Sequence, residues 1–195
     1  AILVATLESL GRRDLQLVLT SFSPDETRFH HALESIPSLH RLLALKRPMG
    51  LARLCIVGVW LSWRHWTGRD SWLPASLRRH VTEIARSDIV VMGGGGYFND
   101  LWREAYPARL AELALFRVLD KRVMIYGQTV GPFNTRFSER FFGPLLRSVR
   151  FIAFRDEQSR KTLEKYNYPI ERAELTADEA NLLAVRQDPD DTRRK

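Results

Sequence analysis

Four consecutive glycines constrain this chain more than any other stretch of it. They follow the apolar run IVVM at 89–92, which predicts a strand buried on both faces, as in a parallel sheet. Glycine has no Cβ, so the backbone around Gly94 and Gly95 is free to turn sharply and to let another molecule approach its N–H groups. We expect a ligand-facing turn here, because open α/β sheets bind ligands at the carboxyl ends of their strands. The alternative is a turn whose glycines only permit tight packing of strand against helix.

Two well-known phosphate-binding patterns are absent from this stretch. No Gly-Lys-Ser/Thr follows the glycines, so the spacing is not that of a Walker A loop. Tyr97 and Phe98 stand where the last glycine of a GxGxxG fingerprint would fall. The glycine run therefore predicts a ligand-facing turn without naming the ligand.

Apolar strands and amphipathic helices alternate along most of the chain. We expect strands at 15–24, 89–92, 123–126 and 149–154 and near 173, and helices at 1–11, 29–46, 74–87, 107–120, 136–147 and 157–166. This alternation predicts an α/β fold with a Rossmann-like parallel sheet, right-handed crossovers and helices on both faces. The strand ends at Gly93, Gly127 and Arg155 would then open on one edge. We assign residues 1–185 to one domain and 186–195 to a polar tail.

A tryptophan-rich segment at 49–72 has two interpretations. It holds Trp60, Trp63, Trp66 and Trp72 around an apolar core, and that core is shorter than the ~20 residues needed to span a bilayer. One interpretation is a helix buried against the sheet or another domain. The other is an interfacial helix with its indole rings at headgroup depth and its arginines facing anionic lipid, which would make the protein a peripheral membrane protein.

The charge balance points to anionic partners. The formal net charge is +7, which favours phosphorylated metabolites, nucleic acid or an anionic membrane surface. The basic residues are scattered with no long run, so we do not expect a nucleic-acid groove. Cys55 is the single cysteine; this excludes an internal disulfide and a cysteine-rich zinc site, and it fits a cytoplasmic protein. The first residue is Ala1 and no signal peptide follows, so we expect a piece cut from a longer cytoplasmic chain.

Polar residues at the expected strand ends are the candidate ligand-binding groups. Arg155 directly follows a strand, where its planar guanidinium can face a carboxylate or a phosphate; the alternative is a surface pairing with Asp156 or Glu157. Asn99 and Gln128 can donate hydrogen bonds to a sugar or an oxyanion, or they are ordinary loop residues.

Two carboxylates join these candidates. Asp100 and Asp178 can serve as acid, base or sugar-hydroxyl partners, and the alternatives are a helix cap for Asp100 and an Asx turn for Asp178. The five histidines follow none of the strand ends and have no metal-ligand spacing, and a Gly-x-Ser-x-Gly elbow is absent. We therefore expect neither a metal site nor a hydrolase triad.

Four motifs in order carry a resemblance to a known family. DIVVMGGGGYFND, VMIYGQTVGP, FIAFRDEQSRKTLEKYN and LTADEANLL, taken together, resemble the polysaccharide pyruvyl transferase family. The match covers 85–183 well and 1–24 loosely. One departure is Glu179, which replaces the proline that usually follows the aspartate in the family.

The resemblance implies a fold and a reaction. Members of the family transfer the enolpyruvyl unit of phosphoenolpyruvate to a sugar of a cell-surface polysaccharide or its lipid-linked precursor, form a pyruvate ketal and release phosphate, with no further cofactor. Their architecture is similar to the two-domain GT-B arrangement, of which this chain would be one Rossmann-like half. By resemblance, Arg155 falls on the phosphoenolpyruvate-binding arginine and Gly94 and Gly95 on the glycine turn. The family's catalytic histidine would lie in the other half, so we expect this chain alone not to complete the reaction.

Two further functions stay open at this stage. A nucleotide-sugar glycosyltransferase of the same architecture would direct the glycine turn at a diphosphate. A non-catalytic module would instead dock on a membrane or a protein through its basic, tryptophan-rich segment. Fold-level similarity does not choose among them, because function depends on the site.

Overall fold

The computed structural model is an α/β protein, and it describes residues 15–44, 50–68, 73–101 and 105–177. Its elements in chain order are β1 (Val18–Ser21), α2 (Pro24–His31), β2 (Glu34–Pro37), α3 (Leu39–Leu43), α4 (Gly50–Thr67), α5 (Ala75–Arg86), β3 (Ile89–Phe98), α6 (Tyr106–Val118), β4 (Arg122–Val130), α7 (Arg136–Leu146), β5 (Phe151–Phe154), α8 (Glu157–Lys165), the 3-10 turn η1 (Ile170–Arg172) and β6 (Ala173–Leu175). The expected alternation of strands and helices is confirmed.

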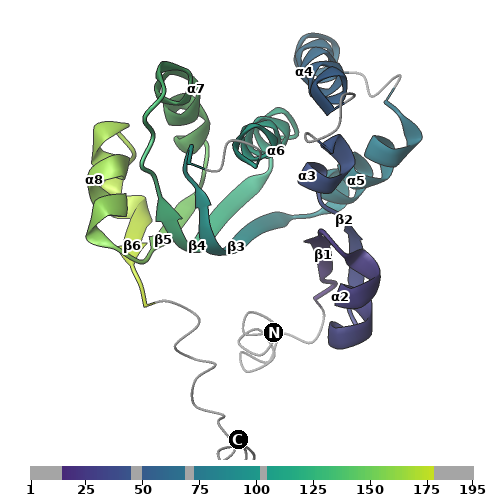
Figure 1. Ribbon diagram of the computed structural model, residues 1–195, viewed down its shortest axis with the longest axis horizontal. Helices are drawn as coiled ribbons and strands as arrows, with labels where there is room; N and C mark the ends of the chain where they lie inside the picture. Colours follow the sequence, from purple (N-terminus) through teal and green to yellow (C-terminus); the bar gives the residue numbers. More distant parts are fainter. Residues whose placement is uncertain (1–14, 45–49, 69–72, 102–104, 178–195) are drawn as a thin grey trace, which may run out of the picture.

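The strands form two parallel sheets. β1 and β2 pair in one, and β3, β4, β5 and β6 pair in chain order in the other. Because each crossover moves to the next strand in the same direction, right-handed connections place α6, α7 and α8 on one face of the four-stranded sheet (Figure 1). The parallel, Rossmann-like architecture flanked by helices is confirmed, whereas helices on the other face of the four-stranded sheet and the second half of a GT-B arrangement stay predictions.

Helix α6 lies at the centre of the core. Its side chains at Ala108, Leu113 and Leu115 are almost completely buried. It packs on β3, on α7 at one side and on α3 and α4 at the other, so it joins the four-stranded sheet to the helices that precede it (Figure 1). Burying such side chains stabilises the fold by roughly 1.5–3 kcal/mol for each large apolar residue.

Two sequence predictions in the first third of the chain need correction or qualification. The expected long helix at 29–46 is instead the end of α2, strand β2 and the short helix α3. Helix α2 ends at Ala32, which is in the left-handed conformation. Ser35 and Ile36 are buried in β2, because pairing with β1 satisfies the backbone there. The expected helix at 1–11 lies outside the described residues.

The prediction of a turn at the four glycines is wrong. Strand β3 continues through them to Phe98, because β4 runs alongside as far as Val130 and supplies partners for their backbone: Gly93 pairs with Tyr126 and Gly95 with Gln128. The register becomes irregular only between Gly95 and Phe98. The carboxyl end of this strand, where a ligand was predicted to bind, therefore lies at Phe98 and not before Gly93.

The second predicted glycine turn is also displaced along its strand. β4 passes through Gly127, where φ is 62° and the register with β5 shifts, and ends at Val130. The loop begins at Gly131, where φ is 87° and an added Cβ would lie 2.8 Å from the hydroxyl oxygen of Thr162. Glycine is required at this position by both its backbone conformation and the close approach of α8.

Candidate functional site

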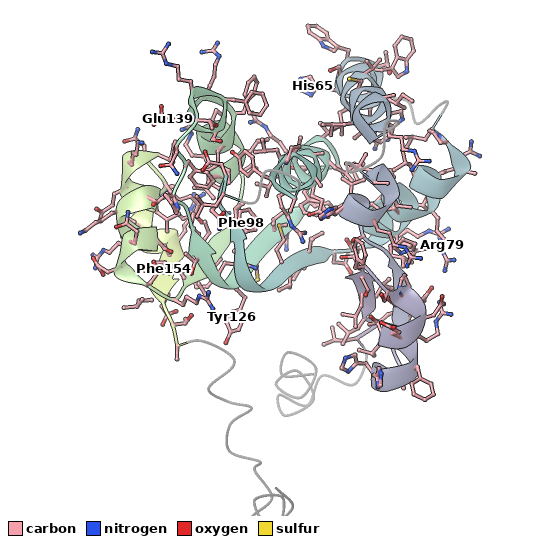
Figure 2. All side chains as sticks on the ribbon, viewed as in Figure 1. His65, Arg79, Phe98, Tyr126, Glu139 and Phe154 are labelled. Atoms are coloured by element: carbon pink, nitrogen blue, oxygen red, sulfur yellow. The ribbon has the colours of Figure 1, made fainter. Side chains whose placement is uncertain are left out.

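The carboxyl ends of β3, β4 and β5 come together at one edge, as their parallel pairing requires. Phe98 and Phe154, the last residues of β3 and β5, mark this edge in Figure 2. Phe98 pairs with Val130, and Phe154 pairs with Gln128. The polar residues that follow these strands are therefore neighbours in space, although the chain separates them by more than fifty positions.

Asn99 closes the chain just after β3. Its side chain is buried, its amide donates to the carbonyl oxygen of Gly96, and its Oδ1 accepts from the N–H of Leu101 at 3.0 Å. This is the geometry of an Asx turn. The amide of Asn99 thus holds the end of the glycine-rich strand.

Asp100 accepts hydrogen bonds from the segment that leads into α7. Its Oδ2 accepts from the N–H groups of Asn134 at 2.6 Å and Thr135 at 2.9 Å, and from the hydroxyl of Ser138 at 3.0 Å. Burial alone would raise the pKa of this carboxyl, but these hydrogen bonds to the ionised form outweigh it and hold the pKa below its ordinary value. Asp100 therefore holds α7 in place across 34 or more sequence positions.

Gln128 lies inside the sheet. Its side chain is only 3% exposed, and its Nε2 donates to the carbonyl oxygen of Gly93 at 2.8 Å. Because Gly93 lies on the neighbouring strand, this bond ties the side chain of β4 to the backbone of β3. Its predicted contact with a sugar or an oxyanion stays a prediction.

Arg155 reaches from the end of β5 across β4 towards β3. Its Nε donates to the hydroxyl of Thr129 at 2.8 Å, and its Nη2 lies 3.7 Å from where a Cβ on Gly96 would stand. The side chain is partly buried. The guanidinium therefore lies beside the end of the glycine run, at a distance where a Cβ on residue 96 would make only an ordinary van der Waals contact with it.

Asp156 holds both Thr129 and the start of α8. Its Oδ2 accepts from the hydroxyl of Thr129 at 2.8 Å, and its Oδ1 accepts from the N–H of Ser159 at 2.7 Å. Burial alone would raise the pKa of Asp156, but the hydrogen bonds from Ser159 and Thr129 and the charge of Arg155 outweigh it, so its pKa lies below the ordinary value. The hydroxyl of Ser159 in turn accepts from the N–H of Val130 at 2.8 Å.

The series of hydrogen bonds that links Arg155, Thr129, Asp156 and Ser159 could be predicted only in part from the sequence. Asp156 with Ser159 three positions later is a helix N-cap pattern, and it could have been found. Thr129 could not, because its role depends on β4 continuing past Gly127. The alternative considered for Arg155, a pairing with its acidic neighbour Asp156, is present in part. The charge of Arg155 lowers the pKa of Asp156, and the hydroxyl of Thr129 bridges the two side chains by hydrogen bonds.

The predicted site residues divide into two groups. Gln128 and Arg155 lie along the β3–β4 side of the edge, whereas Asn99 and Asp100 fasten the loop after β3 to itself and to α7. The backbones of Gly94 and Gly95 lie within β3 beside this edge. Asp178 lies outside the described residues. In the described part of the chain, no three His, Cys, Asp or Glu side chains are grouped to hold a metal ion.

A shallow hollow exists elsewhere, beyond the end of β1. It is lined by Phe22, Ser23, Asp25, Glu26 and Arg41. None of these is a predicted site residue, and two of them are acidic, so the hollow does not suit an anionic ligand.

Comparison with known families gives one match. A model of the polysaccharide pyruvyl transferase family matches residues 1–192. No curated protein and no solved structure matches the chain.

Proposed function

The chain belongs to the polysaccharide pyruvyl transferase family, and we propose that it binds phosphoenolpyruvate through Arg155 at the edge formed by β3, β4 and β5. Membership makes it an enzyme of the transferase class that acts on a polysaccharide or sugar acceptor. The observation that supports the proposed donor site is the guanidinium of Arg155, oriented by the Thr129 hydroxyl and lying beside Gly96. Phosphoenolpyruvate carries a carboxylate and a phosphate, and a planar guanidinium binds either group with two hydrogen bonds.

The reaction we propose balances without a further cofactor. The methylene carbon of phosphoenolpyruvate gains a proton, one sugar hydroxyl adds to the central carbon, and a second hydroxyl displaces phosphate to close the ketal. The two hydroxyl protons end on the new methyl group and on the phosphate. The acceptor is a sugar of a cell-surface polysaccharide or of its lipid-linked precursor, and the reaction takes place in the cytoplasm.

The described residues of this edge suit binding better than proton transfer. Asp100 and Asp156 have pKa values below the ordinary range and accept hydrogen bonds from the protein itself, so both are poor proton donors near neutral pH. None of the described histidines follows β3, β4 or β5. We propose that this chain binds the donor and that ketal formation needs a proton donor from residues beyond those described.

Ligand-dependent unfolding tests the donor site. We would measure the midpoint of thermal unfolding with phosphoenolpyruvate, a UDP-sugar and inorganic phosphate, for the unmodified chain and for Arg155→Ala. A ligand at 100 times its dissociation constant should stabilise the chain by about 2.7 kcal/mol. We expect phosphoenolpyruvate to stabilise the unmodified chain and to have little effect on Arg155→Ala.

A matched control lies just before the same strand. Arg150 is exposed at the other end of β5, so Arg150→Ala removes the same charge away from the edge. This variant should respond to phosphoenolpyruvate as the unmodified chain does. Stabilisation by the UDP-sugar instead would favour a nucleotide-sugar glycosyltransferase, and an unchanged response of Arg155→Ala would remove Arg155 from the site.

A further inference from the structure

Helix α4 is buried on one face and exposed on the other. Trp60 is completely buried, and Val57 and Leu61 are buried on the same side, where α4 packs on α6. The opposite face leaves Val59 60%, Trp63 44% and Trp66 85% exposed. These three positions are spaced i, i+4, i+7 and therefore form one stripe along the helix. The buried-helix interpretation of the tryptophan-rich segment therefore describes one face of α4, and the interfacial interpretation stays a prediction for the other face.

The charge of α4 has a single sign. Its ionisable residues are Arg53, Arg64 and His65, together with the thiol of Cys55, and it contains no Asp or Glu. Arg53 and His65 are exposed, and Arg64 lies over the ring of Trp60 at 5.8 Å. Helices that lie in a membrane interface typically carry cationic side chains beside exposed indole rings. The rings lie at headgroup depth and the cations contact lipid phosphates.

Helix α7 presents a second surface of the same kind. Phe137 and Phe141 are about half exposed, with ring centroids 4.7 Å apart, and Arg136 and Arg140 beside them are exposed. The one acidic residue of α7 is Glu139, whose carboxylate is paired with Lys165 of α8 at 2.7 Å.

The two helices are on the same side of the four-stranded sheet. They pack on either flank of α6, and both lie on the outer, upper side of the molecule in Figure 1. Figure 2 places His65 of α4 and Glu139 of α7 on this side. A flat surface can therefore approach α4 and α7 together.

We propose that α4 and α7 form a docking surface for the anionic face of a lipid bilayer. The match of charge favours this occupant, because the exposed cations of both helices would meet lipid phosphates, α4 carries no acid, and the one acid of α7 is paired with Lys165. The described helices include none that is long and apolar enough to cross a membrane, and the attachment that the proposal describes is peripheral. The proposal does not depend on donor binding at Arg155, although it would bring a lipid-linked acceptor close to the enzyme.

Vesicle sedimentation tests this surface. The whole chain would be mixed with vesicles of phosphatidylcholine alone or of phosphatidylcholine with phosphatidylglycerol, and the bound fraction measured at low and high salt. We expect binding to the anionic vesicles that weakens as salt rises. The double variant Trp63→Ser with Trp66→Ser should lower the partition coefficient roughly tenfold or more, because two indole rings no longer enter the interface.

Two further variants separate a docking surface from a general loss of apolar area. Phe137→Ser with Phe141→Ser should also weaken binding, since α7 belongs to the same surface. Phe29→Ser removes an aromatic ring that is 85% exposed on α2, which packs on β1 and β2, and it should bind as the unmodified chain does. Each variant's thermal unfolding would be compared with that of the unmodified chain to show that it is folded.

Three results would overturn the proposal. The first is no binding to anionic vesicles, and the second is equal binding by the folded tryptophan variant. The third comes from sedimentation velocity without lipid: a dimer that becomes a monomer in the tryptophan variant would show that a second copy of the chain covers α4.

Discussion

The ends of β3 and β5 each carry a polar pair, Asn99–Asp100 and Arg155–Asp156, but the two pairs do different work. Both carboxylates hold the backbone at the start of a helix. Asp100 does so for α7, which begins 36 residues later in the chain, whereas Asp156 caps the helix that follows it directly. Their partners differ more: Asn99 turns back on its own loop, and Arg155 extends over the sheet. The polar pair after β3 holds the loop and α7 in place, whereas the pair after β5 holds α8 and also places the guanidinium of Arg155 over the sheet.

The largest expected effect comes from removing the long-range carboxylate. Asp100→Ala leaves the N–H groups of Asn134 and Thr135 and the hydroxyl of Ser138 without their acceptor. We expect the free energy of unfolding to fall by about 2–4 kcal/mol, measured by urea denaturation. Asp100→Asn keeps one acceptor oxygen and should lose less. Equal losses in the two variants would show that the charge, rather than the hydrogen bonds, stabilises this strand end.

The carboxylate of Asp156, whose contacts are more local, should contribute less to the free energy of unfolding than that of Asp100. Asp156→Ala removes the N-cap of α8 and the acceptor for Thr129, and we expect a loss of about 1–2 kcal/mol in the same measurement. Asp156→Ser keeps a capping oxygen and is the matched control. If Asp156→Ala lowered the free energy of unfolding as much as Asp100→Ala does, the proposed difference between a local and a long-range hydrogen-bonded carboxylate would be wrong.

Acid should weaken both strand ends. The pKa of each carboxyl is lower in the folded chain than its ordinary value of 3.8, so the stability it contributes is complete well above that value and is lost as the pH falls through the folded pKa. We therefore expect the free energy of unfolding to decrease as the pH is lowered below about 5. Asp100→Asn should make that decrease shallower, as followed by urea denaturation at a series of pH values. An unchanged slope would mean that other carboxyl groups govern acid unfolding.

The difference between the two strand ends also shows how far sequence reasoning reached. The strand before Arg155 and the helix after it were predicted nearly to the residue, because both patterns are local. The turn at the glycines was predicted too early in the chain. The apolar run ends at Met92, but the pairing of β3 with β4 continues to Phe98. A run of glycines gives no local sign of a strand, and only a neighbouring strand makes it one.

The contacts of the site were harder to predict than its position. The sequence predicted Arg155 and Gln128 at or near the ends of parallel strands, and the structure has both on the β3–β4 side of this edge, where their contact with a ligand stays a prediction. It gave no sign that Asp100 would hold α7 or that Thr129 would contact Arg155, because those hydrogen bonds join residues 26 to 38 positions apart. Such pairs become visible only when the strand order is known.

The smallest effect on stability, and the sharpest test of the end of β5, is expected from Thr129. Thr129→Val keeps the shape of the side chain but removes the hydroxyl that accepts from Arg155 and donates to Asp156. Because these groups are only partly buried and water can replace the hydroxyl, we expect the free energy of unfolding to change by less than about 1 kcal/mol. The guanidinium would, however, lose the contact that orients it, and affinity for phosphoenolpyruvate should fall roughly three- to tenfold.

Thr129→Ser separates orientation from stability, because it restores the hydroxyl and should restore the affinity. Titration calorimetry of both variants with phosphoenolpyruvate would make the comparison. Equal affinity in the valine and serine variants would show that Arg155 is positioned without Thr129, and the hydrogen bonds at the end of β5 would then hold the fold together, as those at the end of β3 do. Weaker binding in the valine variant only would show that one chain of hydrogen bonds both caps α8 and aims the cation at the ligand, which is the distinction between the two strand ends.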